Sequence, residues 1–388
     1  MKNFNFISPT KIYFGKNREI EIGKIVKEFG YKKVLLHYGQ SSIKKIGLYD
    51  KIVNSLREEN IDFIELSGVE PNPKIELVRK GTTIVKNEKV DFILAVGGGS
   101  VIDSAKAISA GALVDFDPWL FNSHEKVCTN SIPVGVILTI SAAGSELSNS
   151  CVITNGNIKN GFNSDSIRPV FAIMNPELTY SVSKYQTACG IVDIMMHTLE
   201  RFLVDYNHSD LVDDWALALI KNVMKAGKIA IDNPNDYDAR STLMLASSFS
   251  HNGLTGLGND FYFTVHKLEH QITGLYDHVA HGAGLSILFV PWAKVVYPYL
   301  KDRFLRLSYE VLDVVPTNNV EEDIEFGLNK LKQYFIDICM PVSLSEVNVD
   351  DTNFELIANR ITKNDTVKVV GFVELDKEKI LKILNLAK

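Results

Sequence analysis

The first half of the chain alternates short apolar runs with longer amphipathic stretches. The apolar runs predict buried strands at residues 33–38, 61–66, 92–96 and 133–139, and the amphipathic stretches predict helices at residues 42–56, 74–86 and 101–113. Strands that alternate with helices in this way predict β-α-β units around a parallel sheet. The opening segment, residues 6–14, is expected to add an antiparallel ribbon at the edge of that sheet.

From about residue 184 the strand pattern stops and long helical periodicities replace it. Helices are predicted at residues 210–231, 239–249 and 324–338. We therefore expect two domains, a Rossmann-like α/β domain over residues 1–183 and an all-α domain over residues 184–388.

Composition narrows the class of protein. A chain of 388 residues is longer than a single hydrophobic core usually supports. A composition of 46% hydrophobic and 23% charged residues is typical of a globular protein. The net charge is −6, and the lysines are interleaved with acidic residues, so we expect no nucleic-acid partner. No apolar stretch approaches about 18 residues and the N-terminus lacks a signal-type core, so we expect no membrane partner and a cytoplasmic location.

Histidines gather in two segments of the helical half. His197 follows Asp193 by one helical turn, and His270 follows His266 at the same spacing. Residues at i and i+4 share one helix face, so each pair can aim two donor atoms at one point. His281 opens a Gly-rich turn that is expected to start the next helix. A carboxylate with imidazoles and no thiolate suits Fe²⁺ or Zn²⁺, so the pattern predicts a metal site.

A single histidine on an apolar helix is more often a satisfied core residue than a ligand. Two such pairs beside a His-Gly-x-Gly turn are uncommon by chance, so we favour the metal interpretation. No role is assigned from the sequence to the other histidines: His37, His124, His208, His251 and His278.

A strand, a Gly-rich turn and a helix follow one another over residues 91–106. The glycines Gly97, Gly98 and Gly99 let the backbone approach a ligand, and the following helix presents unpaired N–H groups. That arrangement suits a pyrophosphate, although a tight strand-to-helix turn is the alternative. A second turn, residues 138–146, is rich in small hydroxyl side chains and could line the same cofactor or be only a polar loop.

Together these segments resemble the iron-containing (group III) alcohol dehydrogenases, and among them the butanol dehydrogenase-like branch. The resemblance runs along nearly the whole chain and is carried by residues 38–49 and 66–73, the Gly97 turn, residues 144–146, Arg168-Pro169 and both histidine segments. It implies a dinucleotide-binding α/β domain followed by a helical domain, together a dehydroquinate synthase-like architecture. It also implies one catalytic metal and a dimer formed through the N-terminal edge.

The resemblance also implies roles for individual residues. The metal ligands would be Asp193, His197, His266 and His281, and His270 would be a catalytic histidine near the nicotinamide rather than a ligand. The cofactor contacts would be Asn72, Gly98, Gly99, Ser100, Asp103, Thr139 and Lys159.

Two positions depart from the family pattern. The step to the last ligand carries one extra residue, which makes His278 a rival to His281 as the fourth ligand. Ala143 stands where relatives often carry threonine, so one hydroxyl contact to the cofactor is missing.

The turn after the predicted strand at residues 33–38 bears on the choice of nucleotide. NAD-selective enzymes place an acid after the second strand, where it binds the adenosine ribose and repels a 2′-phosphate. Residues 39–42 contain no acid, so we expect NADP(H), with Gly39, Ser41 and Ser42 at the 2′-phosphate.

The sequence therefore predicts a metal-dependent, NADP(H)-linked alcohol dehydrogenase or aldehyde reductase that acts on primary short- to medium-chain alcohols and aldehydes. Two alternatives remain. A dehydroquinate synthase-like lyase would need basic residues for a phosphorylated substrate, whereas the metal segments are flanked by apolar side chains such as Met195 and Phe263. An inactive metal- and nucleotide-binding protein is the other.

Overall fold

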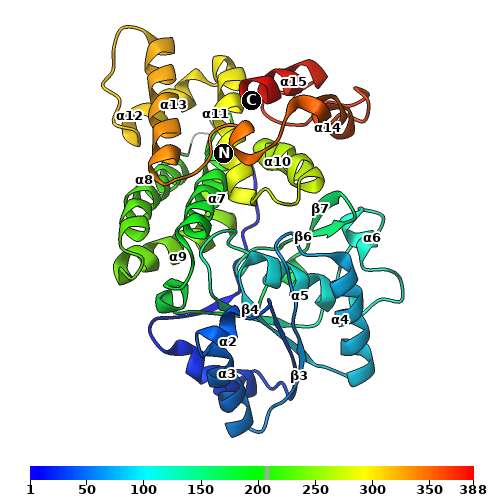
Figure 1. Ribbon diagram of the computed structural model, residues 1–388. Coiled ribbons are helices and arrows are strands. Elements are labelled where there is room, and N and C mark those ends of the chain that lie inside the picture. The colour runs from blue at the N-terminus through cyan, green and yellow to red at the C-terminus, as the bar shows by residue number, and fades with distance from the viewer. Residues whose placement is uncertain (206–208) are drawn as a thin grey trace. The chain divides into compact units, whose positions relative to one another are not determined.

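The computed structural model describes residues 1–205 and 209–388 and divides into two compact units (Figure 1). One unit is Ile7–Val182, and the other combines Met1–Phe6 with Ser183–Lys388. The N-terminal residues thus join the helical unit and not the α/β unit that contained them in the sequence-based division. One reason is the ion pair between Lys2 and Asp260.

A six-stranded sheet forms the centre of the first unit. Its strands are β1 (Lys11–Phe14), β2 (Lys33–Tyr38), β3 (Asp62–Leu66), β4 (Phe92–Gly97), β5 (Val134–Leu138) and β8 (Phe171–Met174). They lie in the order β1-β8-β5-β4-β2-β3, and every neighbouring pair is parallel. The predicted parallel α/β domain is confirmed.

The prediction of an antiparallel ribbon at the start of the chain is wrong. Strand β1 pairs in parallel with β8, with Lys11 opposite Phe171. Strand β1 is the outermost strand of the sheet, beside β8, and so it continues the parallel arrangement. The Lys11 N–H donates to the Val170 carbonyl at 3.1 Å and fixes this register.

Helices cover both faces of the sheet. They are α1 (Ile22–Glu28), α2 (Ser42–Lys45), α3 (Leu48–Glu58), α4 (Ile75–Glu88), α5 (Gly99–Gly111) and α6 (Trp119–Asn122). Side chains of β2 alternate between the faces: Val34 and Leu36 join the core under α1 and α3, whereas His37 reaches Ser104 of α5. Helices α4 and α5 pack against each other (Figure 1).

The helix predicted over residues 42–56 is divided into α2 and α3. Gly47 adopts the left-handed conformation, with φ +71°, and forms the N-cap of α3. Glycine takes this conformation at little cost, so the chain can turn there and start a second helix.

A two-stranded antiparallel hairpin, β6 (Ser150–Asn155) with β7 (Ile158–Asn163), was missed from the sequence. The turn between them is Gly156-Asn157, and Gly156 has φ +58°. A Gly-Asn pair between two strand-forming runs is a known signal for a two-residue hairpin turn, so the sequence did contain the information.

The second unit is helical, as predicted. Its helices are α7 (Lys184–Phe202), α8 (Asp210–Asp232), α9 (Tyr237–His251), α10 (Thr264–Leu275), α11 (His281–Val296), α12 (Lys301–Glu310), α13 (Val320–Asp337), α14 (Phe354–Ile361) and α15 (Lys377–Leu386). Helices α7 and α11 are buried along nearly their whole length. Among the helices that the structure describes, none combines the length and apolar character needed to span a membrane.

Candidate metal centre and nucleotide site

Helix α7 carries the first two predicted ligands on one buried face. Ser183 begins the helix by accepting a hydrogen bond from the Gln186 N–H at 3.2 Å. Asp193 and His197 lie one turn apart, and His197 Nδ1 is 3.3 Å from Asp193 Oδ1. Both side chains are less than a tenth exposed, so they can hold a cation away from bulk water.

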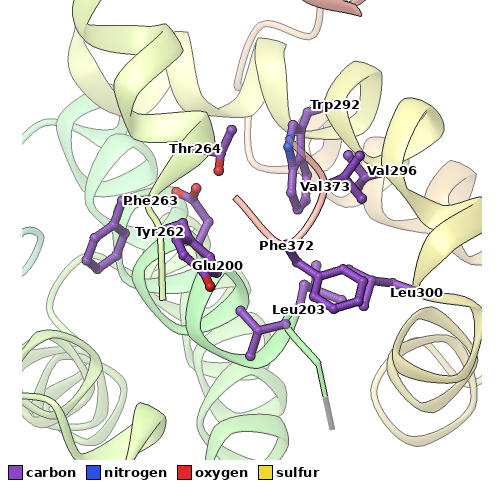
Figure 2. A pocket seen from close by; sticks show the side chains of 11 residues that line it. Glu200, Leu203, Tyr262, Phe263, Thr264, Trp292, Val296, Leu300, Phe372 and Val373 are labelled. Atoms are coloured by element: carbon purple, nitrogen blue, oxygen red, sulfur yellow. The ribbon is translucent and has the colours of Figure 1, made fainter. Parts of the chain in front are cut away.

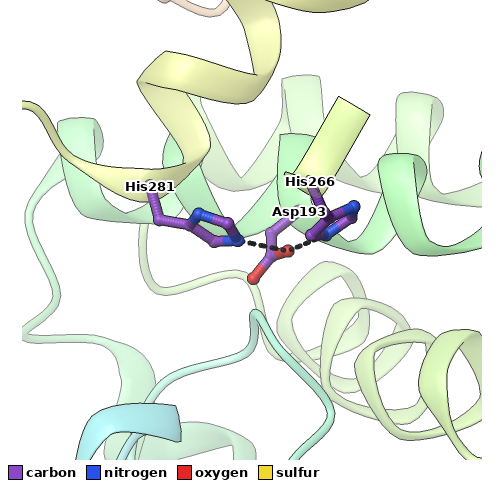
Figure 3. A group of neighbouring side chains, drawn as sticks. All are labelled: Asp193, His266 and His281. Carbon is purple, nitrogen blue, oxygen red and sulfur yellow. Dashed lines mark ion pairs between the residues drawn. The ribbon is translucent and has the colours of Figure 1, made fainter. Parts of the chain in front are cut away.

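Two further helices bring the other predicted ligands to the same carboxylate. His266 on α10 places Nε2 3.6 Å from Asp193 Oδ1, and His281, the first residue of α11, places Nε2 3.7 Å from the same oxygen. Figure 3 shows both imidazoles pointing at Asp193. These two histidines and Asp193 form a group whose donor atoms all lie within 4.8 Å of one another.

The spacing of these atoms fits a bound metal ion. Two ligand atoms that each lie about 2.1 Å from a tetrahedral ion are about 3.4 Å apart. The three imidazole nitrogens lie 3.3, 3.6 and 3.7 Å from Asp193 Oδ1. Within the described part of the chain, Asp193 Oδ1, His197 Nδ1 and His266 Nε2 are buried and have no hydrogen-bond partner. Buried polar atoms rarely stay unsatisfied, so a cation would complete their coordination.

His197 has a slightly different place from the other three. It is not part of the group within 4.8 Å, although its ring centroid lies 4.5 Å from that of His266. The four residues predicted as ligands are thus brought to one location in the helical unit, with Asp193 in contact with each histidine.

Two glycines explain why the helices can approach so closely. A Cβ on Gly282 would lie 2.3 Å from the Cys189 carbonyl oxygen of α7, and one on Gly284 would lie 2.8 Å from Glu269 Cγ of α10. The glycines of the His-Gly-Ala-Gly segment therefore belong to helix α11 and permit its contact with α7 and α10.

Two buried carboxylates behind the histidines were not predicted from the sequence. Glu200 Oε2 contacts His266 Nδ1, and Glu269 Oε2 lies 2.5 Å from His281 Nδ1. A carboxylate on the far nitrogen of a ligating histidine fixes the orientation and tautomer of the ring. The signal for Glu200 was present, because it follows Asp193 by seven residues and so shares its helix face.

The pKa values of two of these histidines are shifted in opposite directions. Burial lowers the pKa of His197 well below its usual range, which favours the neutral imidazole that binds metals. Burial also acts to lower the pKa of His266, but the Glu200 and Asp193 carboxylates outweigh it and raise the pKa to about 9. The site concentrates negative charge, as a divalent cation requires.

An aromatic side chain in a strained conformation covers two of the histidines. Phe263, which precedes α10, has φ +47°, a value that bulky side chains rarely adopt. Its ring meets those of His197 and His266 edge-on at 5.7 and 5.2 Å. The buried Arg201 guanidinium lies 4.6 Å from the same ring and donates to the His197 carbonyl at 2.7 Å. Together these groups keep one side of the cluster dry and fixed.

A small pocket adjoins Glu200 and Phe263 (Figure 2). Its other lining residues are mainly apolar and include Trp292, Leu300 and Phe372, but none of the four predicted ligands. Its volume of about 10 Å³ is close to the minimum for one water molecule, so it cannot hold an alcohol substrate.

His270 and His278 differ in their distance from the proposed ligands. His270 is a fifth exposed and its Nε2 lies 4.0 Å from Glu269 Oε2, with its ring 5.7 Å from His281. His278, the rival fourth ligand, is exposed, and its Nε2 lies 3.0 Å from the Val347 carbonyl, away from the cluster. His208 lies outside the described residues.

The Gly-rich turn of the α/β unit joins β4 to α5, as predicted. Gly98 is the N-cap of α5, and its carbonyl accepts from the Val101 and Ile102 N–H groups. A Cβ on Gly98 would lie 2.1 Å from Ile140 Cγ2, and one on Gly99 would lie 3.1 Å from Ala143. The glycines thus let the turn pack against the loop that follows β5.

Asp103 and the neighbouring Lys106 tie that loop to α5. The buried Lys106 ammonium donates to oxygens of residues 145–150 at 2.7–3.2 Å. Asp103 accepts from the Ser145 hydroxyl at 2.6 Å and from the Val152 N–H at 2.9 Å. The contacts of Asp103 therefore hold the loop, and its predicted contact with the cofactor stays a prediction.

The turn after β2 lies at the same end of the sheet, because parallel strands all end there. The Gly39 carbonyl accepts from the Gly68 N–H at 3.0 Å, and the turn continues through Ser41 into α2, which Ser42 begins. Lys44 follows this turn, and its ammonium lies over the Tyr49 ring, 4.6 Å from the ring centroid. The ammonium therefore already has a partner other than the turn.

Three other predicted cofactor positions are also near this end. Thr139 follows β5 directly and its N–H donates to the Gly97 carbonyl at 3.1 Å. Asn72, with φ 54°, lies in the β3–α4 loop, which contacts the hairpin through Lys74 and Thr154. Lys159 is a buried residue of β7 opposite Thr154. A groove of about 390 Å³ is formed by the β3–α4 loop and the start of α4 and is lined by Gly68, Glu70, Lys74, Glu76, Leu77 and Lys80.

Comparison with known proteins agrees with this arrangement. The family model for iron-containing alcohol dehydrogenase matches residues 9–176, and the model for the C-terminal part of the Fe-containing alcohol dehydrogenase family matches residues 187–387. The chain belongs to the iron-containing alcohol dehydrogenase family. The resemblance inferred from the motifs is confirmed.

Several members of the family are similar over almost the whole chain. NADH-dependent butanol dehydrogenase A of Clostridium acetobutylicum is 37% identical over 99% of both chains, and the NADPH-dependent aldehyde reductase YqhD of Escherichia coli is 30% identical over 94% of both. The crystal structure of NADH-dependent butanol dehydrogenase A from Thermotoga maritima has a TM-score of 0.95 and 35% identity, with 100% of this chain and 99% of that chain covered.

Membership in the iron-containing alcohol dehydrogenase family defines the class of reaction. The chain is an alcohol dehydrogenase or aldehyde reductase that works with a nicotinamide nucleotide and a metal. Neither family model describes a lyase, so the lyase alternative is set aside.

Proposed function

We propose that this chain uses NADP(H) to interconvert primary short- to medium-chain alcohols and aldehydes at one divalent metal, Fe²⁺ or Zn²⁺. The proposed ligands are Asp193, His197, His266 and His281. The observation that carries the proposal is the set of buried, unpartnered donor atoms that converge on Asp193 Oδ1 in the described helical unit.

The protein's own residues have distinct parts in this reaction. A bound divalent ion would supply Lewis acidity for the substrate oxygen, and a bound nicotinamide would supply or take up the hydride. Asp193 and the three histidines would fix the ion, and Phe263 and Arg201 exclude water from one side of the cluster. His270 is part-exposed one turn after His266, so its imidazole can accept or donate the proton that the oxygen loses or gains.

The nucleotide would lie at the carboxyl end of the sheet. The Gly98, Gly99 and Ser100 N–H groups begin a helix of 13 residues and suit a pyrophosphate. Asn72, Asp103, Thr139 and Lys159 are the further proposed contacts. The preference for NADP(H) rests on the turn of Gly39, Ser41 and Ser42, which offers hydroxyls and no acid; relatives of this chain are named for either nucleotide.

The names of the relatives support the proposed substrate class, since several are butanol dehydrogenases. We also propose a homodimer formed through the N-terminal edge of the sheet, where β1 is the outermost strand.

The experiment compares three variants prepared without oxygen and loaded with Fe²⁺ or Zn²⁺. His197→Ala and His266→Ala each remove a ligand, so bound metal and NADPH-dependent reduction of butanal should both fall to background. His270→Ala is the matched control. It should keep the metal and bind NADPH but turn over about 10²–10⁴-fold more slowly, which is the usual effect of losing a positioned acid or base.

Two results would contradict the proposal. Full metal content in the His197 and His266 variants would show that the ligands are elsewhere. Loss of metal from His270→Ala would make that residue a ligand. Treatment of the wild type with a chelator provides the reference for complete metal loss, and the same preparation assayed with NADH gives the nucleotide preference.

A further inference from the structure

Glu269 occupies an unusual place behind the proposed metal site. It lies on α10 between His266 and His270, and its side chain is fully buried. Its Oε2 is 2.5 Å from His281 Nδ1 and 4.0 Å from His270 Nε2. One carboxylate of α10 is therefore next to both a proposed ligand on α11 and the proposed proton-transfer histidine.

The two nitrogens of His281 face different partners. Nε2 lies 3.7 Å from Asp193 Oδ1, and Nδ1 lies beside Glu269. A neutral imidazole carries one proton, and only the other nitrogen can bind a metal. The 2.5 Å contact between His281 Nδ1 and Glu269 Oε2 does not have hydrogen-bond geometry in the structure. A carboxylate this close favours the tautomer with the proton on Nδ1, which leaves the Nε2 lone pair toward Asp193.

We propose that Glu269 is a positioning residue for the metal site: it accepts the Nδ1–H of His281 and so directs Nε2 toward the proposed ion. This inference rests on the metal site of the proposed function. Glu269 acts here through His281, although its carboxylate also forms a group with His270 and His281 whose ligand atoms lie within 4.8 Å of one another.

Gly284 of α11 has no side chain and so leaves space for the Glu269 carboxylate. A Cβ on Gly284, one turn into α11, would lie 2.8 Å from Glu269 Cγ and 3.2 Å from its Oε1. Burying an unpaired carboxylate is strongly unfavourable, so a purely space-filling role would be served better by an apolar side chain.

Glu269 can be tested more cleanly than the second carboxylate. Glu200 also accepts the Val265 N–H at 2.6 Å and thereby caps α10. A substitution of Glu200 would remove a helix cap and a histidine partner together, whereas Glu269 lies within α10.

The test measures Zn²⁺ and Co²⁺ affinity of the full-length, chelator-treated protein, with no activity assay required. Glu269→Leu keeps the volume but removes the acceptor, and should weaken both metals about 10–100-fold. Glu269→Gln keeps an acceptor oxygen without the charge and should lie between Glu269→Leu and the wild type. Glu378→Gln, an exposed residue of α15, is the control and should bind as the wild type does.

Two further measurements separate positioning from packing. The visible spectrum of bound Co²⁺ should change in Glu269→Leu, because the ligand field depends on the orientation of His281. Gly284→Ala keeps the Glu269 carboxylate but displaces it, because the added methyl group would lie too close to the Glu269 side chain. This variant should also weaken metal binding. If Glu269→Leu does not fold, Glu269→Gln and Gly284→Ala provide the same comparison.

Unchanged metal affinity in the Glu269 variants would overturn the inference, and so would a loss of thermal stability in the metal-depleted protein with no change in affinity. The proposed metal site fails by a different result: His266→Ala would then bind Zn²⁺ and Co²⁺ as tightly as the wild type.

Discussion

At Gly39 the absence of a side chain bears on the choice of nucleotide. The position is open, since a Cβ there would meet only the Val69 carbonyl oxygen at 3.6 Å, an ordinary contact, and Gly39 does not have a positive φ. A larger residue is therefore compatible with the backbone, and a substitution reports on charge rather than on strain.

Replacement of Gly39 by Asp should reduce NADPH binding by about 1–3 kcal/mol and spare NADH, because the carboxylate would repel a 2′-phosphate. Gly39→Asn adds the same bulk without the charge and should leave the ratio of kcat/KM values for the two nucleotides near that of the wild type. An unchanged ratio in Gly39→Asp would show that the 2′-phosphate is bound elsewhere.

At the scale of elements, His37 links two strands and a helix of the α/β unit. Its Nδ1 lies 2.8 Å from the Leu66 carbonyl of β3, and its Nε2 lies 2.9 Å from the Ser104 hydroxyl of α5. Burial is the main cause that lowers the pKa of His37, from its usual 6.5 to about 4. The neutral ring can donate to the carbonyl and accept from the hydroxyl, so it satisfies both contacts.

This lowered pKa predicts acid sensitivity. Between pH 6.5 and 4 the unfolded chain binds a proton at His37 and the folded chain does not, so stability falls as the pH falls through this window. The loss should total about 3 kcal/mol at pH 4 and about 2 kcal/mol at pH 5.

Urea unfolding at pH 7 and pH 5 checks the prediction. The wild type should lose more stability over this interval than His37→Gln, which has no titrating group at the position. His124→Asn, at an exposed histidine of the same unit, is the control and should follow the wild type. Equal losses in the wild type and His37→Gln would contradict the assignment.

At the scale of the whole molecule, the two proposed cofactor sites lie in different compact units. The metal donors belong to Ser183–Lys388, and the nucleotide positions belong to Ile7–Val182. A ligand stabilises the part of the protein that it binds, by about 2.7 kcal/mol at a concentration of 100 Kd.

Hydrogen exchange should therefore distinguish the two ligands. Addition of Zn²⁺ to chelator-treated protein should slow amide exchange in α7, α10 and the start of α11, because the proposed donors join these helices. NADPH should slow exchange in the β4–α5 turn. Protection by Zn²⁺ confined to the α/β unit, or by NADPH confined to the helical unit, would contradict the assignment of the sites.

Local sequence patterns determined much of this protein. Apolar runs and amphipathic stretches predicted the parallel sheet and the main helices, because a strand or helix buried on a known face must show the matching period. The spacing of Asp193 and His197, and of His266 and His270, identified the metal segments because one helical turn brings such residues together. The break at Gly47 and the hairpin turn at Gly156 were also encoded locally, although they were not recognised.

Only the tertiary structure decided which donors meet and what supports them. The ligands come from α7, α10 and α11, and the sequence could not exclude His278 or reveal that Glu269 stands behind His281. The parallel pairing of β1 with β8 and the docking of Met1–Phe6 on the helical unit likewise join segments more than a hundred residues apart. Contacts of this kind depend on packing between elements, and no local period records them.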